Sequence, residues 1–179
     1  ATFFNYYPTF KMLSDGRFII SSERSGWKHL YLYGPQGKDK NIRLLLQLTK
    51  GNFPVEDIIS FDESDAVVYF TAYSDDKRVY DKHFMRVGLN GKGLIQLTKK
   101  AGIHNIQLSP SKDYFLDAHS SVSRPPTTEI RSTTDGSLVS VIEQANITKL
   151  TNLNWRVPEE FVVKADDGKT DLHGIIYKP

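Results

Sequence analysis

Short apolar segments separated by polar, glycine-containing turns run along most of this chain, for example at residues 18–20, 67–72 and 114–116. Segments of this length, rich in β-branched and aromatic residues, are typical of strands. The one weak helical pattern lies at residues 138–150, where a short helix or turn is an alternative to a strand. The pattern predicts an all-β protein.

A repeat groups these expected strands into cycles. The tetrapeptide Gln-Leu-Thr-Lys occurs at residues 47–50 and again at residues 96–99. Before each copy come a polar turn, a short apolar strand, a polar loop and an aromatic-rich strand, the last at residues 29–33 and 83–87. A weaker third cycle covers residues 108–142.

Each cycle also contains a glycine turn, at residues 35–37, 89–91 and 134–136. Asn-Gly and Asp-Gly are strong hairpin signals because a type I′ turn needs two residues that tolerate positive φ. Short strands with a unit period of about 40 to 50 residues are typical of β-propeller blades. We therefore expect about three four-stranded antiparallel blades over residues 1–145; an ordinary β-sandwich is the alternative.

The cycles stop near residue 146, and a different organisation follows. Residues 146–160 read as an interdomain linker, in which Pro158 favours extended geometry before it. Residues 161–179 predict a hairpin, with strands at 161–164 and 172–177. A lone hairpin is marginally stable in water. We expect it to pack on a part of the protein absent from this sequence, so that the chain is a fragment.

Composition and charge exclude several classes of function. The formal net charge is +2 with no long run of like charges, which does not support nucleic acid as a partner. The chain has no cysteine, which excludes disulfides, thiolate metal sites and a cysteine nucleophile. No apolar run approaches the roughly 18 residues of a membrane span.

Several segments, in this order, resemble the dipeptidyl peptidase IV family of serine peptidases. The first, Ser-Glu-Arg-Ser-Gly-Trp-Lys-His-Leu-Tyr-Leu-Tyr, resembles a blade signature of that family, and the last resembles the hairpin that opens its α/β-hydrolase domain. The matching segments are residues 22–33, 47–55, 68–72, 97–104, 104–126 and 166–179. The resemblance implies that the chain is the C-terminal part of the β-propeller followed by the first hairpin, residues 161–179, of the hydrolase domain.

The resemblance also implies a parent enzyme that releases N-terminal Xaa-Pro or Xaa-Ala dipeptides by serine-hydrolase chemistry. The propeller would shape the active-site cavity and limit access to it. Expected partners are peptide substrates bound through the parent, the hydrolase domain and a second copy of the parent in a homodimer. No cofactor is expected, and the family favours a periplasmic, secreted or membrane-anchored location.

The chain lacks the motifs that would carry this chemistry. No two of its glycines are four residues apart, so the Gly-x-Ser-x-Gly nucleophile elbow is missing. The family's pocket arginine has no match at residues 3–5, and Glu159 and Glu160 read as a solvated linker. We therefore expect no catalytic, substrate-binding or metal-binding residues here, and no activity from this chain alone.

The remaining polar candidates read as structural. The five histidines, His29, His83, His104, His119 and His173, show no metal-ligand spacing, and we expect none of them to be a ligand or catalytic. The resemblance implies structural hydrogen bonds for His29 and His104, which recur at blade-specific positions in the family. Ser109 reads as a turn residue, and Trp27 and Trp155 as packing residues. Two other classes remain open: an acylaminoacyl peptidase or another prolyl oligopeptidase-type enzyme, and a non-enzymatic binding propeller. The terminal hairpin argues against the last.

Overall fold

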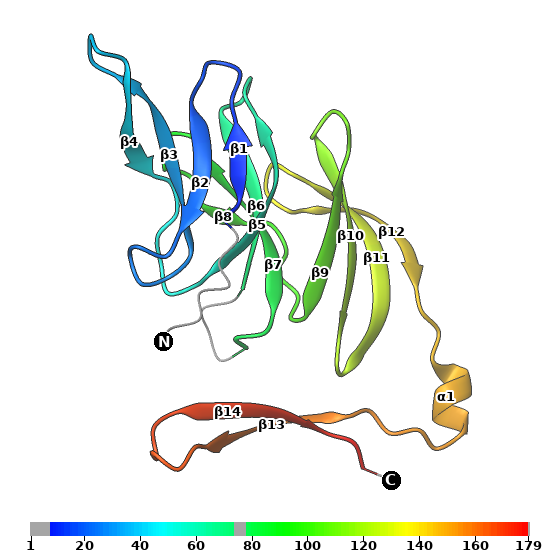
Figure 1. Cartoon of the computed structure of the whole chain (residues 1–179). Helices are drawn as coiled ribbons and strands as arrows, with labels where there is room; N and C mark the ends of the chain where they lie inside the picture. The colour runs from blue at the N-terminus through cyan, green and yellow to red at the C-terminus, as the bar shows by residue number, and fades with distance from the viewer. Residues whose placement is uncertain (1–7, 74–77, 179) are drawn as a thin grey trace. The chain divides into compact units, whose positions relative to one another are not determined.

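The structure is a computed structural model that describes residues 8–73 and 78–178. It forms two compact units, which Figure 1 shows in one view. The first unit contains residues 1–100 and 133–137, and the second contains residues 101–132 and 138–179. Each unit is described separately below.

The first unit consists of two successive groups of four antiparallel strands. The first group pairs in the order β1-β2-β3-β4 and the second in the order β5-β6-β7-β8. The strands are β1 (Phe10–Met12), β2 (Phe18–Ser22), β3 (His29–Gln36), β4 (Asn41–Gln47), β5 (Val55–Asp62), β6 (Val67–Tyr73), β7 (Lys82–Gly88) and β8 (Ile95–Gln96).

The second unit contains a third group of four antiparallel strands, a short helix and a hairpin. The strands of this group pair in the order β9-β10-β11-β12, and β13 pairs with β14. The elements are β9 (Ile103–Leu108), β10 (Tyr114–Ser121), β11 (Arg124–Ser132), β12 (Leu138–Gln144), α1 (Thr148–Asn152), β13 (Glu159–Lys164) and β14 (Asp171–Ile176).

Three groups of four antiparallel strands confirm the predicted all-β class. The helix proposed as an alternative for residues 138–150 is wrong over most of that range, because β12 covers Leu138–Gln144. The helix Thr148–Asn152, five residues long, follows, and none of its residues is buried. The predicted domain boundaries at residues 145 and 160 stay a prediction.

The glycine turns close hairpins as predicted, but not as type I′ turns. In the second cycle Gly91 has a φ of +72°, whereas Asn90 is not among the residues with positive φ. The Gly91 N–H donates to the Gly88 carbonyl at 2.8 Å, and the Gly88 N–H donates to the Lys92 carbonyl at 2.9 Å. Residues 89–91 therefore form a three-residue loop, with Gly91 in the left-handed conformation. The Asn90 side chain accepts the Lys92 N–H at 2.9 Å, which stabilises this loop instead of a type I′ turn.

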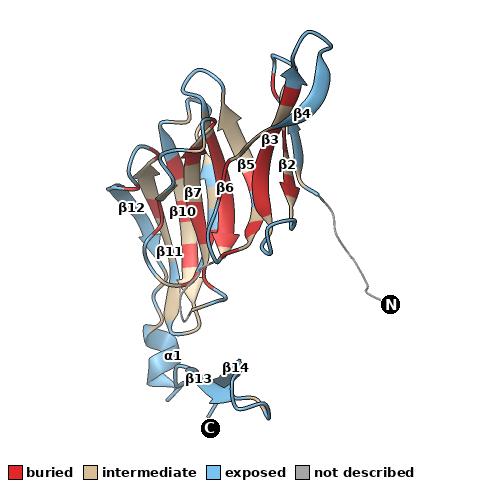
Figure 2. Ribbon diagram, turned by 90° about the vertical axis from the view of Figure 1, so that its left-hand side faces the viewer, coloured by how far each residue is buried: buried red, intermediate tan, exposed pale blue. Residues whose placement is uncertain are grey.

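The two four-stranded groups of the first unit pack against each other through an apolar core. Fully buried residues come from both groups, among them Ile19 and Leu30 from the first and Val68 and Phe70 from the second. Figure 2 shows these central strands in the colour of buried residues. The Val55 N–H also donates across the groups to the Lys28 carbonyl at 2.7 Å. Neighbouring four-stranded sheets joined by a shared apolar core are the arrangement expected of propeller blades.

Two strand segments of the second unit expose apolar side chains instead. All residues of β12 are exposed, including four large aliphatic ones, and so are all residues of β13; both are pale blue in Figure 2. On the hairpin, Phe161, Val163, Leu172 and Ile176 share one face by strand register. No helix among the described residues is long and apolar enough to cross a membrane.

Candidate functional site

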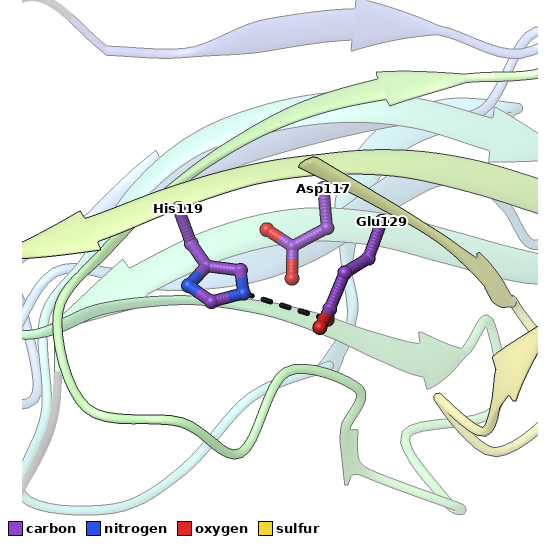
Figure 3. A group of neighbouring side chains, drawn as sticks. All are labelled: Asp117, His119 and Glu129. Carbon is purple, nitrogen blue, oxygen red and sulfur yellow. Dashed lines mark ion pairs between the residues drawn. The ribbon is translucent and has the colours of Figure 1, made fainter. Parts of the chain in front are cut away.

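Five ionisable side chains cluster on one face of the third strand group. Three of them, Asp117, His119 and Glu129, offer ligand-type atoms that all lie within 4.8 Å of one another (Figure 3). His104 and Arg131 complete the cluster from the flanking strands. It is the only group of metal-ligand type found among the residues that the structure describes.

Strand register brings these residues together. Asp117 and His119 are two positions apart on β10, so they point to the same face. His104 of β9 lies directly opposite His119, and Glu129 of β11 lies directly opposite Asp117. Two carboxylates at directly opposed positions repel each other. The cluster therefore needs positive charge or hydrogen-bond donors around the carboxylates.

His104 and Arg131 supply these donors. His104 Nδ1 lies 2.7 and 2.9 Å from the two oxygens of Asp117. Arg131 donates to Glu129 Oε2 from Nη2 at 2.7 Å and from Nε at 3.0 Å, and its Nε lies 3.7 Å from Asp117. His119 Nε2 lies 3.4 Å from Glu129 Oε2. Both carboxylates are at least 98% buried, so these contacts offset the cost of removing the charges from water.

The arrangement fits a buried ion-pair network better than a metal site. Carboxylate and imidazole groups at these separations are suitable ligands for a divalent cation. However, the Arg131 guanidinium already binds the Glu129 oxygen that a cation would need. A cation would have to displace that guanidinium or lie next to its positive charge. The chemical role of the cluster is thus to hold β9, β10 and β11 together.

In the first strand group the repeated tetrapeptide forms hydrogen bonds that join Gln47 and Thr49 to each other and Thr49 to residues 29–30. We call this set of hydrogen bonds a latch. The Thr49 hydroxyl accepts the Leu30 N–H at 2.9 Å and lies 3.1 Å from His29 Nδ1. His29 Nε2 lies 3.1 Å from the Gly51 carbonyl, which can only accept, so Nε2 carries the proton in the neutral ring. The Thr49 hydroxyl then donates to Nδ1, while the Gln47 side chain donates to the Thr49 carbonyl at 2.9 Å.

The second strand group repeats the same latch. The Thr98 hydroxyl accepts the Phe84 N–H at 3.0 Å and lies 3.2 Å from His83 Nδ1. The Gln96 side chain donates to the Thr98 carbonyl at 2.8 Å. The sequence repeat therefore has a physical basis, because each copy closes its strand group with the same hydrogen bonds. The structural role predicted for His29 is confirmed.

Replacing Thr49 by valine should lower the free energy of unfolding by about 2 kcal/mol, because two buried groups lose their hydroxyl partner. These groups are the Leu30 N–H and the His29 ring. Chemical denaturation measures the change. Thr49→Ser keeps the hydroxyl and should stay within about 1 kcal/mol of the unmodified chain; an equal loss from both variants would show that the hydroxyl is not the cause.

Burial lowers the pKa of His29 from its usual value of 6.5, against a smaller opposing effect of the hydrogen bond to the Gly51 carbonyl. The ring resists protonation more when folded than when unfolded. Stability that is fully present above pH 6.5 should therefore decrease as the pH falls from 6.5 toward the folded pKa. NMR titration of the ring should give a midpoint below 6.5, and His29→Gln should remove this part of the pH dependence. A midpoint above 6.5 would contradict the assignment.

The other residues singled out in the sequence lie apart from the buried cluster. Ser109 forms a turn, as predicted, with its hydroxyl accepting the Tyr114 N–H at 3.3 Å. Glu159 belongs to β13 and pairs with Lys178 at 2.6 Å. Trp27 and Trp155 expose 43% and 41% of their surface, and their packing at blade edges or the domain junction stays a prediction. Residues 3–5, where the family's arginine was sought, lie outside the described residues.

Sequence reasoning missed the buried cluster as a unit. It gave His104 a structural hydrogen bond, expected no ligand or catalytic role for His119, and did not consider Asp117, Glu129 or Arg131. A signal was present, since Asp-x-His and Glu-x-Arg place two ionisable residues on the same face of each expected strand. That His104 bonds within the fold confirms its predicted structural role. The expectation that no residue binds metal, substrate or takes part in catalysis stays a prediction.

Comparisons with known proteins agree with this architecture. The chain is 22% identical over 157 residues to a probable dipeptidyl peptidase 4 of Emericella nidulans, covering 81% of this chain and 19% of the relative. It is 26% identical over 158 residues to dipeptidyl peptidase 4 of Trichophyton rubrum, covering 86% and 19%. The chain thus spans about a fifth of the length of these relatives.

Solved structures match over nearly the whole chain. Dipeptidyl peptidase 4 of Porphyromonas gingivalis superposes with a TM-score of 0.75 at 19% identity, covering 96% of this chain and 23% of that protein. A putative dipeptidyl aminopeptidase IV of Bacteroides ovatus gives a TM-score of 0.74 at 26% identity, covering 95% and 26%. These matches confirm the predicted propeller-type fold, here as open strand groups.

A model of the family described as the dipeptidyl peptidase IV N-terminal region matches residues 2–126, which is more than half of the chain. The matched segment contains both latches and two of the cluster's strands, β9 and β10. The chain belongs to the dipeptidyl peptidase IV N-terminal region family.

Proposed function

We propose that this chain is the non-catalytic propeller part of a serine exopeptidase that releases N-terminal Xaa-Pro or Xaa-Ala dipeptides from peptides. The observation that carries the proposal is the family match over residues 2–126. Likeness to the Bacteroides ovatus putative dipeptidyl aminopeptidase IV over 95% of the chain supports it. The propeller shapes the active-site cavity and limits which peptides enter it.

The chemistry resides in a hydrolase domain that follows the propeller. The sequence supports this division, because it contains no Gly-x-Ser-x-Gly elbow. The ionisable cluster of the second unit also supports it. Its carboxylates are buried and already bound by His104 and Arg131, so they are not available to act on a peptide.

The terminal hairpin supports a partner domain of the same kind. It exposes Phe161, Val163, Leu172 and Ile176 on one face. An exposed apolar face on a two-stranded hairpin requires a cover, since two strands alone bury too little surface to be stable. In the proposed enzyme the hydrolase domain provides that cover, and the parent assembles as a homodimer.

Hydrolysis of Gly-Pro-p-nitroanilide tests the proposal. The protein expressed from the complete reading frame should hydrolyse it, and a serine-reactive phosphonate should abolish the activity. The 179-residue chain alone should show none. Preference for N-acetyl-alanyl-p-nitroanilide would favour an acylaminoacyl peptidase, and inactivity of the complete protein on both substrates would contradict the proposal.

A further inference from the structure

The turn between β10 and β11 contains an arginine that pairs with no carboxylate among the described residues. Arg124 is the first residue of β11 and lies opposite Ser121 in the strand register. Its Nη2 atom is buried and has no hydrogen-bond partner in the described part of the chain. Its Nε reaches only the Ser121 hydroxyl, at 3.5 Å. A buried donor left without an acceptor costs about 1–3 kcal/mol, so this atom requires an explanation.

Four other arginines pair with a nearby carboxylate: Arg17, Arg43, Arg78 and Arg131. Arg86 also has a buried nitrogen, Nε, without a hydrogen-bond partner among the described residues. Arg124 differs because its turn, residues 120–126, contains three serines and two prolines but no acidic residue. A carboxylate that pairs with Arg124 must therefore lie outside this turn.

The hydroxyl groups of the turn add to the donors at this position. Ser121 Oγ lies 3.5 Å from Arg124 Nε, and Ser123 Oγ lies 3.4 Å from Ser121 Oγ. A register shift between His119 and Ser121 displaces the end of β10 from regular pairing at this point. A guanidinium beside the Ser121 hydroxyl, with the Ser123 hydroxyl next to that one, presents several N–H and O–H donors and no negative charge. Carboxylates are bound by donor sets of this kind, with the planar guanidinium as the strongest member.

We propose that Arg124, together with the Ser121 and Ser123 hydroxyls, is a binding subsite for a carboxylate group. The guanidinium donates through Nη2, which is the buried atom that now lacks an acceptor. Two sources of the carboxylate share this chemistry: an acid in solution, such as the terminal or side-chain carboxylate of a peptide, and a carboxylate of the protein outside these 179 residues. The subsite does not depend on the proposed peptidase activity.

The position of the turn is compatible with both sources. The Ala145 N–H donates to the Pro126 carbonyl at 2.9 Å, so the turn lies beside the point where the chain leaves β12. The chain spans about a fifth of the length of its curated relatives, and the second source is a carboxylate outside this span.

Thermal unfolding of the 179-residue chain in sodium acetate, against sodium chloride at the same pH and ionic strength, tests the first source. Acetate at about 100 mM should raise the midpoint by roughly 2–4 °C if the subsite is empty in this chain. Arg124→Met should lose this acetate-specific gain. Arg24→Met is the matched control and should keep it, because Arg24 stacks on Tyr31 and bonds to Tyr33.

The same two solutions applied to the protein from the complete reading frame test the second source. A carboxylate supplied by that protein would remove the acetate effect, while Arg124→Met would lower the midpoint by several degrees. Either pattern supports the subsite. The proposal is overturned if neither protein shows an acetate-specific gain and Arg124→Met lowers neither midpoint. Hydrolysis of Gly-Pro-p-nitroanilide, measured separately, distinguishes this failure from failure of the proposed function.

Discussion

Replacing Arg131 by methionine is expected to lower the free energy of unfolding by about 3–5 kcal/mol. The substitution keeps the length of the side chain but removes the charge that binds Glu129 and lies near Asp117. The two carboxylates then remain buried at directly opposed strand positions with less compensation. Urea unfolding of the 179-residue chain, followed by far-UV circular dichroism, measures the loss.

Two further variants separate the buried network from a general loss of charge. Adding Glu129→Gln to Arg131→Met removes one of the uncompensated charges and should recover part of the loss. Lys178→Met breaks an exposed pair with Glu159 and should cost less than about 1 kcal/mol. A loss from Arg131→Met as small as that from Lys178→Met would contradict the buried-network description.

Replacing Gly136 by alanine is expected to cost about 3 kcal/mol or more, because a side chain here meets the backbone. An ideal Cβ at this position would lie 1.9 Å from the Leu97 carbonyl oxygen. The glycine also has a φ of +76°, which is unfavourable for any residue with a Cβ. Leu97 directly precedes the Thr98 latch, so relieving the clash would disturb the closure of the second strand group.

Gly168→Ala is the matched control for this substitution. Gly168 has a similar φ of +65°, but nothing lies within 4 Å of an ideal Cβ. It should therefore cost only the backbone strain of the left-handed conformation, about 1–2 kcal/mol. The difference in midpoint between the two variants isolates the contact with Leu97. Equal losses would show that this contact can relax at little cost.

Local sequence was sufficient to predict the strand groups because the repeat and the turns are local features. The copies of Gln-Leu-Thr-Lys at residues 47–50 and 96–99 fall where the chain completes equivalent strand groups. In both copies the threonine hydroxyl accepts a backbone N–H near the start of the aromatic-rich strand. The repeated letters therefore encode repeated hydrogen bonds, which explains why the prediction holds.

The buried ion-pair network could not be assembled from sequence because it depends on register across three strands. Asp117 meets Glu129 only because β10 and β11 pair in one particular alignment. A shift of one residue in this pairing would place the two carboxylates on opposite faces of the sheet. The alternation within each strand was visible in the sequence, but the partners across strands were not.

The turn type and the position of the short helix also could not be predicted from the local sequence pattern. The Asn90-Gly91 pair correctly indicated a hairpin, yet the asparagine side chain stabilises a three-residue loop instead of a type I′ turn. The helix Thr148–Asn152 lacks a side-chain cap at its N-terminus, and the weak helical pattern at residues 138–150 overlaps only its first three residues. Its five residues lie inside the segment predicted as a linker.

Labelling with a fluorophosphonate tests most directly whether the reactive serine lies outside this chain. The probe reacts with the activated serine of a serine hydrolase. Applied to the protein from the complete reading frame and followed by peptide mapping, it should modify one serine outside these 179 residues. Modification of a serine within residues 1–179, blocked by a Gly-Pro substrate, would contradict the assignment of this chain as a non-catalytic propeller part.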